Sequence, residues 1–196
     1  MIDKINDELK EISFDSYPAH YPETGIRYVT KKNPVLIEVG GGGTAKNMLQ
    51  FIAENDGGKL ITIDLCTKPR TVMRIDNKDV GESGAGDYSS KIELYKTLLS
   101  KPTISEHFEY HNMDAYTYFT TIHKGMIDFY FDDGTHHSEY LIPLFEKVLP
   151  FCNKGAIVGT HDKGDANMKE FCEWLSKHER VDEEIPNGES LLVRLK

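Results

Sequence analysis

The sequence of 196 residues lacks long apolar runs and has few cysteines. A membrane-spanning helix needs about 20 consecutive apolar residues, so we expect no membrane span and no membrane partner. The N-terminus also lacks the basic and apolar regions of a secretory signal. Three cysteines stand far apart and form no Cys-x-x-Cys pair, which is typical of reduced thiols in the cytoplasm. The sequence therefore predicts a cytoplasmic protein without a disulfide framework.

Positively charged residues are outnumbered by negatively charged ones. The chain has 23 Lys and Arg against 32 Asp and Glu, a formal net charge of −9. A nucleic-acid-binding protein needs a basic surface to displace counter-ions, so this balance disfavours a nucleic-acid partner, although a local basic patch around Lys68, Arg70 and Arg74 stays open. Repeats and low-complexity tracts are absent too. The length suits one domain, which we expect over 34–196, with an N-terminal helix and loop over 1–33 belonging to it.

Apolar periodicity predicts alternating strands and helices. Strands are expected over 35–39, 60–64, 108–111, 126–131 and 155–160, and helices over 2–12, 45–52, 92–99, 141–149 and 168–175. Strands joined through helices are parallel, with right-handed crossovers. Asn187-Gly188 lies between two apolar runs and predicts a hairpin of 181–185 with 191–195. We therefore predict an α/β fold, Rossmann-like, with a doubly wound, mostly parallel sheet and a C-terminal antiparallel hairpin.

Two polar stretches interrupt this alternation. Residues 16–32 carry prolines and a glycine among aromatic residues and are expected to form a loop. Residues 66–87 are polar, with three glycines near the end. A structureless stretch of this length is often a lid or a substrate loop, although a surface insertion without a role is an equal alternative.

The segment Val35–Thr44 is the strongest ligand-binding signal. An apolar strand containing Glu38 runs into four glycines, after which a helix begins. Glycines let bare backbone N–H groups approach a ligand. Gly40-x-Gly42-x-x-Ala45 satisfies the dinucleotide fingerprint, and Asp64 follows about 20 residues later, where a ribose-binding acid belongs. Spacing alone leaves NAD open, but Glu38 would repel a pyrophosphate and favours S-adenosylmethionine, which carries no phosphate.

Acidic residues follow each predicted parallel strand. In open α/β sheets, ligands bind at the carboxyl ends of the strands. One acid at such a position is readily explained as a capping or solubilising residue, whereas a series indicates a cleft for hydroxyl, amine or cationic groups. The series is Glu38, Asp64, Asp114, Asp133 and Asp162.

These motifs, in this order, resemble the class I S-adenosylmethionine-dependent methyltransferases, and among them the small O-methyltransferase-like group. The resemblance runs from about Asn33 to Lys196. Val35–Gly42 resembles the first family motif, Ile61–Asp64 the second and Asn112–Tyr116 the third, whereas 127–136 with 155–162 resembles the strand ends that carry the chemistry. The resemblance implies that the cofactor is bound by Glu38, Gly40, Gly42, Asp64, Asp114, Ala115 and Asp133.

The same resemblance implies methyl transfer to a hydroxyl group of a small acceptor, either a sugar or an aromatic compound. His136 is the expected general base, with Asp133 and Asp162 as further catalytic residues. His161 and His137 lie near the same strand ends and are alternative candidates for the base, of which His137 is the weakest. Asp133 and Asp162 are also the expected ligands if Mg²⁺ assists by lowering the pKa of the acceptor hydroxyl.

Three positions depart from the family pattern. Thr44 stands where many relatives have a third glycine, and Thr135 replaces the second aspartate of an Asp-Gly-Asp-His pattern. Lys163 stands where metal-dependent members often have a third oxygen ligand. These departures keep a non-catalytic, cofactor-binding or scaffold domain open as an alternative, and an NAD-binding oxidoreductase as a weaker one. A homo-oligomer is also compatible with the sequence.

Overall fold

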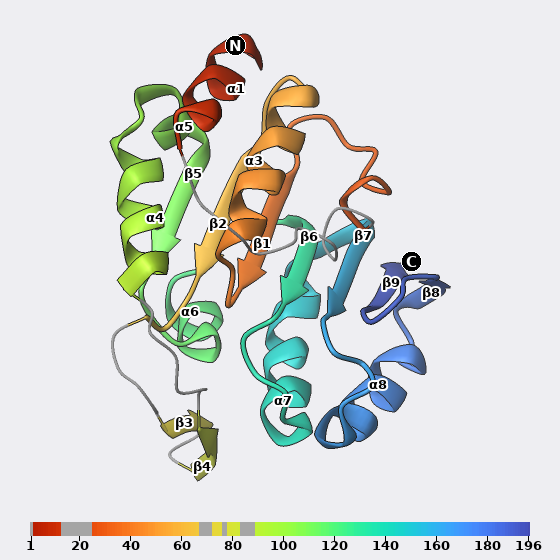
Figure 1. Cartoon of the computed structure of the whole chain (residues 1–196). Coiled ribbons are helices and arrows are strands. Elements are labelled where there is room, and N and C mark those ends of the chain that lie inside the picture. The colour runs from red at the N-terminus through yellow and green to blue at the C-terminus, as the bar shows by residue number, and fades with distance from the viewer. Residues whose placement is uncertain (1, 13–24, 67–71, 76–77, 83–88) are drawn as a thin grey trace.

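The computed structural model of the chain describes residues 2–12, 25–66, 72–75, 78–82 and 89–196. A seven-stranded sheet lies at its centre, in the order β5-β2-β1-β6-β7-β9-β8 (Figure 1). The first five of these strands run parallel, and β9 runs antiparallel to both of its neighbours. The predicted sheet and its C-terminal hairpin are therefore confirmed. The strands are β1 (Val35–Val39), β2 (Lys59–Ile63), β5 (Phe108–His111), β6 (Ile127–Asp132), β7 (Cys152–Thr160), β8 (Val181–Ile185) and β9 (Leu191–Leu195).

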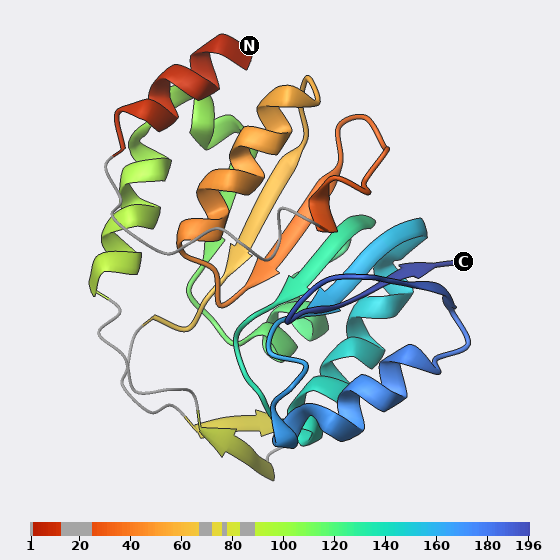
Figure 2. The ribbon, with the colours of Figure 1, turned by 45° about the vertical axis from the view of Figure 1, so that its right-hand side comes forward.

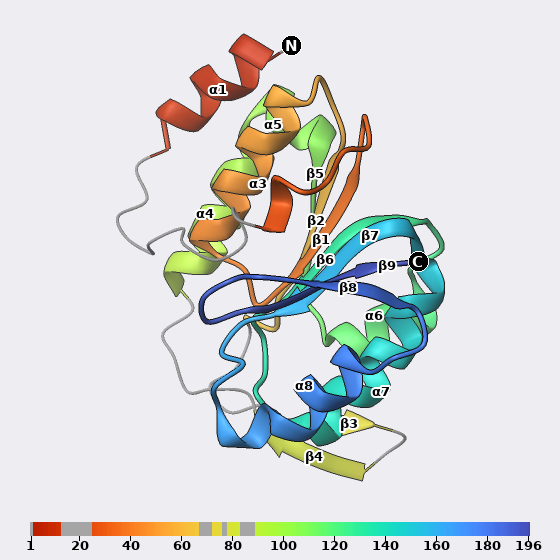
Figure 3. The same cartoon turned by 90° about the vertical axis from the view of Figure 1, so that its right-hand side faces the viewer.

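Helices cover both faces of the sheet (Figure 3). One face carries α1 (Ile2–Lys10), α3 (Gly43–Glu54), α4 (Ser89–Ser100) and α5 (Pro102–His107). The other face carries α6 (Ala115–Thr121), α7 (Ser138–Val148) and α8 (Lys169–Ser176), with the short 3₁₀ helices η1 (Leu149–Phe151) and η2 (Ala166–Met168). This is the doubly wound arrangement that the sequence predicts.

The core is divided by the sheet, because successive side chains of a strand point to opposite faces. On β1, Leu36 packs with α3 on one face and Ile37 packs with α7 on the other. All six residues of β6 are buried, which is typical of a central parallel strand covered on both faces. The strands therefore hold their carboxyl ends at one fixed edge, where the acidic residues follow.

Three elements differ from the sequence-based expectation. The stretch 66–87 contains an antiparallel hairpin of β3 (Val72–Ile75) and β4 (Lys78–Glu82), which lies against α7 (Figure 2). Pro102 begins α5 rather than only ending α4, because proline suits the first turn of a helix. Helix α6 follows Asp114 and was not predicted.

Other parts of the expectation fall partly or wholly outside the described residues. The expected loop over 16–32 is described only from residue 25 onward, and Lys68 and Arg70 of the expected basic patch are not described. Among the described helices, none has both the length and the apolar character needed to cross a membrane.

Candidate active site

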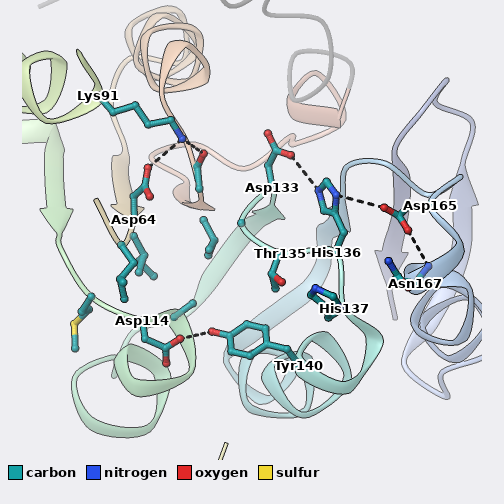
Figure 4. A pocket seen from close by; sticks show the side chains of 17 residues that line it. Asp64, Lys91, Asp114, Asp133, Thr135, His136, His137, Tyr140, Asp165 and Asn167 are labelled. Carbon is teal, nitrogen blue, oxygen red and sulfur yellow. Dashed lines mark hydrogen bonds and ion pairs between the residues drawn. The ribbon is translucent and has the colours of Figure 1, made fainter. Parts of the chain in front are cut away.

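A cavity of about 440 Å³ opens at the carboxyl ends of β1, β2 and β6 (Figure 4). Its volume lies within the usual range for small-molecule sites, and its position is where open α/β sheets bind ligands. Six of the residues predicted from the sequence line it: Gly40, Asp64, Asp114, Ala115, Asp133 and His136. Glu38, Gly42 and Asp162 do not line it. Residues that were not predicted also line it, among them Lys91, Met113, Tyr140, Asp165 and Asn167.

Gly40 joins the end of β1 to the end of β6. Its backbone has a φ of +72°, and a Cβ added there would lie 2.5 Å from the carbonyl oxygen of Asp133. Only glycine adopts this conformation at no steric cost and leaves room for such a contact. The Gly40 amide also donates to the Ile63 carbonyl at 3.0 Å, so the turn is held between the ends of β2 and β6.

Glu38 lies beneath this glycine turn. A Cβ added at Gly41 would lie 2.4 Å from Glu38 Oε1, so the carboxyl group is directly under the backbone. Its two oxygens accept hydrogen bonds from Thr44 Oγ1 at 2.5 Å and Thr62 Oγ1 at 2.6 Å. Burial raises the pKa of Glu38 to about 7. Thr44, which stands where many relatives have glycine, thus supports the acid of the motif.

Asp64 follows β2 and is 7% exposed. Its Oδ2 accepts hydrogen bonds from Tyr95 OH at 3.0 Å and from Lys91 Nζ at 3.3 Å. Lys91 Nζ also donates to the Gly40 carbonyl at 2.9 Å. Lys91 and Tyr95 are four residues apart on α4, so they share a helix face. From the sequence, this spacing could have placed Lys91 on the same helix face as Tyr95. Nothing in the sequence indicated that this face would contact Asp64.

Asp114 connects two helices at the cavity. As the N-cap of α6, its Oδ1 accepts from the Thr117 amide at 2.9 Å. Its Oδ2 accepts from Tyr140 OH on α7 at 2.6 Å, and the same hydroxyl accepts from the Tyr116 amide at 3.3 Å. The carboxylate therefore fixes the cavity wall next to Ala115.

His136 follows β6 and lies among three carboxylates, of which Figure 4 shows those of Asp133 and Asp165. Its Nε2 is 3.9 Å from Asp133 Oδ1, and its Nδ1 is 3.6 Å from Asp162 Oδ2 and 3.9 Å from Asp165 Oδ2. The contact with Asp133 is the main cause that raises the pKa of His136, and the charges of Asp162 and Asp165 add to it. The structure thus brings together His136, Asp133 and Asp162, the three predicted catalytic residues.

His161, one of the three histidines considered for the base, lies between the two predicted metal ligands. Its Nδ1 is 3.2 Å from Asp133 Oδ1 and 3.2 Å from Asp162 Oδ1, and its Nε2 is 3.7 Å from Glu189 Oε2. The contact with Asp133 is the largest cause that raises the pKa of His161. When protonated, this imidazole places one positive charge between the two carboxylates.

The same groups offer donors for a cation. Ligand atoms of His161, Asp162 and Glu189 lie within 4.8 Å of one another. Lys163 does not fill this position, because its ammonium donates to the Asn187 carbonyl at 2.8 Å. A divalent ion here requires deprotonated ligands and therefore a neutral His161. Carboxylates with an imidazole fit such an ion, but Mg²⁺ prefers oxygen ligands alone.

Thr135 contributes a hydroxyl group to the cavity wall. It is 7% exposed, and its Oγ1 has no hydrogen-bond partner within the described part of the chain. Buried polar groups are nearly always paired with protein, water or ligand atoms. The threonine that replaces the family aspartate therefore leaves a hydroxyl available to a bound molecule.

The sequence matches a family model described as a methyltransferase domain over residues 37–163. The comparison with curated proteins found no match.

Several solved structures have a similar fold. A candidate caffeoyl-CoA O-methyltransferase from Staphylococcus aureus is 16% identical with a TM-score of 0.61, covering 100% of this chain and 91% of its own. The O-methyltransferase TomG from Streptomyces achromogenes, solved with S-adenosylmethionine, is 15% identical with a TM-score of 0.60, covering 99% and 88%. The TDP-rhamnose 3'-O-methyltransferase of calicheamicin biosynthesis is 14% identical with a TM-score of 0.55, covering 88% and 77%. At these identities the likeness is one of fold.

Proposed function

The chain belongs to the methyltransferase domain family, and from that premise we propose that it methylates a hydroxyl group of a small acceptor, with His136 as the general base. Family and fold identify an S-adenosylmethionine-dependent methyltransferase. The observation that carries the proposed chemistry is the position of His136 on the cavity wall, facing the carboxylates of Asp133, Asp162 and Asp165.

We assign the cofactor to the half of the cavity that lies over β1 and β2. Asp64 is the proposed ribose ligand, because it follows β2 and its carboxylate lines the cavity. Asp114 and Ala115 are proposed to flank the adenine, with Asp133 at the other end of the cofactor. Gly40 and Gly42 supply the turn, and Glu38 acts through that turn rather than by direct contact.

The bound cofactor supplies an electrophilic methyl group, so the protein has to align the acceptor and take up its proton. Neutral His136 accepts the hydroxyl proton, and the resulting imidazolium is stabilised by the neighbouring carboxylates. Asp133 and Asp162 are proposed to hold the ring in position. Asp165 and Asn167 add polar groups beside it, which suits a hydroxylated acceptor of the sugar or the aromatic type.

The first test compares His136→Gln with His137→Gln. We expect His136→Gln to lower turnover by about 10²–10⁴-fold, because a general base contributes that much. Its affinity for S-adenosylhomocysteine, measured by calorimetry, should stay within about twofold of wild type, and His137→Gln should lose far less turnover. Activity would be followed over a panel of hydroxylated sugars and phenols.

The pH profile gives an independent reading of the same residue. Because the base must be neutral, wild-type turnover should rise with pH through the raised pKa of His136, with its midpoint above 6.5. The residual activity of His136→Gln should lack this rise. If His137→Gln lost more turnover than His136→Gln, His137 and not His136 would be the general base. Cofactor binding without transfer to any acceptor would favour the non-catalytic alternative, and tighter binding of NAD would contradict the cofactor assignment.

Mg²⁺ is a second candidate for activating the acceptor. Asp133 and Asp162 would hold it, and it would supply a Lewis acid that lowers the pKa of the hydroxyl. We expect turnover to survive EDTA, because protonated His161 places a positive charge 3.2 Å from both carboxylates and so competes with a metal ion for them. Loss of turnover with EDTA and its recovery with Mg²⁺, but not Ca²⁺, would establish the metal-assisted route instead.

A further inference from the structure

Lys91 lies across the glycine turn and reaches into the cavity (Figure 4). Its side chain is 23% exposed, and its Cε would lie 3.4 Å from a Cβ added at Gly42. The ammonium donates to the Gly40 carbonyl at 2.9 Å and to Asp64 Oδ2 at 3.3 Å. Lys91 is the one lysine or arginine among the described residues that line this cavity.

The two groups that accept hydrogen bonds from Lys91 belong to Asp64 and Gly40, both of which are assigned above to the cofactor site. A carboxylate oxygen that already binds an ammonium is a poorer acceptor for a ribose hydroxyl. The pair is also well shielded, since Asp64 is 7% exposed, so the interaction is screened less than an ion pair on the surface. A ligand that needs Asp64 Oδ2 or the Gly40 carbonyl must therefore first displace the ammonium.

We propose that Lys91 is an internal competitor of the adenosyl cofactor, and that cofactor binding moves its ammonium off Asp64. This inference rests on the proposed function, because it requires that Asp64 and the glycine turn receive the cofactor. Part of the binding free energy is then used to break the Lys91 contacts. Lys91 thereby weakens the binding of both the methyl donor and its demethylated product, and it speeds the exchange of the product for a new donor.

The test measures S-adenosylhomocysteine binding by calorimetry in three variants. Lys91→Met keeps the apolar stem over Gly42 but removes the charge, and we expect its Kd to fall about tenfold, or 1.4 kcal/mol. Lys91→Arg keeps a cation and should stay within about threefold of wild type. Lys96→Met is the matched control, because Lys96 is exposed on the same helix and should leave Kd unchanged. A Kd for Lys91→Met that is equal to or higher than that of wild type would overturn the proposal.

Crystal structures without and with S-adenosylhomocysteine provide a second measurement that does not depend on variant stability. We expect Lys91 Nζ within hydrogen-bond distance of Asp64 Oδ2 in the free protein and away from it in the complex. An ammonium that stays on Asp64 Oδ2 in the complex overturns the proposal, as does a free protein without the contact.

The calorimetric results distinguish a wrong competitor role for Lys91 from a wrong proposed function. If wild type binds the ligand and Lys91→Met binds it no more tightly, the competitor role is wrong and the proposed function stands. If neither protein binds, both are wrong. Binding by Lys91→Met alone would support the competitor role directly.

Discussion

At the scale of single residues, Glu38 is a buried acid with a raised pKa that also supports the glycine turn. Its carboxyl group is buried under the glycine turn and held by two threonine hydroxyls, and burial raises its pKa to about 7. The folded protein therefore keeps a proton on this group over a pH range in which the unfolded chain, with a pKa near 4.5, has released it. Folding stability depends on pH wherever the two states bind different numbers of protons.

The first prediction at this scale concerns Glu38→Gln. Between pH 4.5 and 7 the folded state binds more protons at this site, so this contribution to stability falls as pH rises. At 1.36 kcal/mol per pKa unit, the total change is up to about 3 kcal/mol. Urea unfolding at several pH values should show the free energy of wild type falling relative to that of Glu38→Gln over this range.

Glu54→Gln is the control for that measurement, since Glu54 is exposed at the end of α3. The difference between this variant and wild type should stay flat over the same pH range. Parallel pH curves for wild type and Glu38→Gln would mean that Glu38 ionises normally beneath the turn.

At the scale of elements, Tyr140 joins α7 to the N-terminus of α6. Its hydroxyl donates to Asp114 at 2.6 Å and accepts from the Tyr116 amide at 3.3 Å. Tyr140→Phe leaves two polar groups without this partner, and we expect a loss of about 1–3 kcal/mol in the free energy of unfolding. We also expect weaker cofactor binding, because Asp114 is a proposed adenine-side residue.

Tyr116→Phe removes a hydroxyl from the neighbouring, half-buried ring and provides the comparison. It should change both the urea midpoint and the calorimetric Kd much less than Tyr140→Phe does. Equal effects of the two variants would show that the hydroxyl of Tyr140 has no special part in holding Asp114.

The short elements are those that the sequence did not reveal. Helix α6 has seven residues, mostly threonine and aromatics, which are weak helix formers. Its signal was local: Asp114 caps the helix and accepts from Thr117, three residues later. The β3–β4 hairpin lies in a polar stretch, and the burial of Ile75 against the core beside α7 is a tertiary contact that periodicity does not report.

At the scale of the whole molecule, the apolar runs and their order were enough to predict the parallel sheet, and hence the edge at which the acids meet. The contacts between side chains within the site could not be predicted from these runs. His161 between Asp133 and Asp162, and Lys91 on Asp64, depend on side chains from elements that are distant in sequence. The role of 1–33 as part of the same domain, the cytoplasmic location and the oligomeric state stay predictions.

The central position of β1 also has a consequence for synthesis. One edge of β1 pairs with β2 soon after it is made, but Val39 meets its other partner only at Asp132, about ninety residues later. At roughly 5–20 residues per second, a ribosome needs about 5–20 s for that length. During this interval the nascent chain carries an apolar strand with an open edge, a template for pairing with other chains. The strand that carries the glycine turn therefore stays exposed to pairing with other chains throughout this interval.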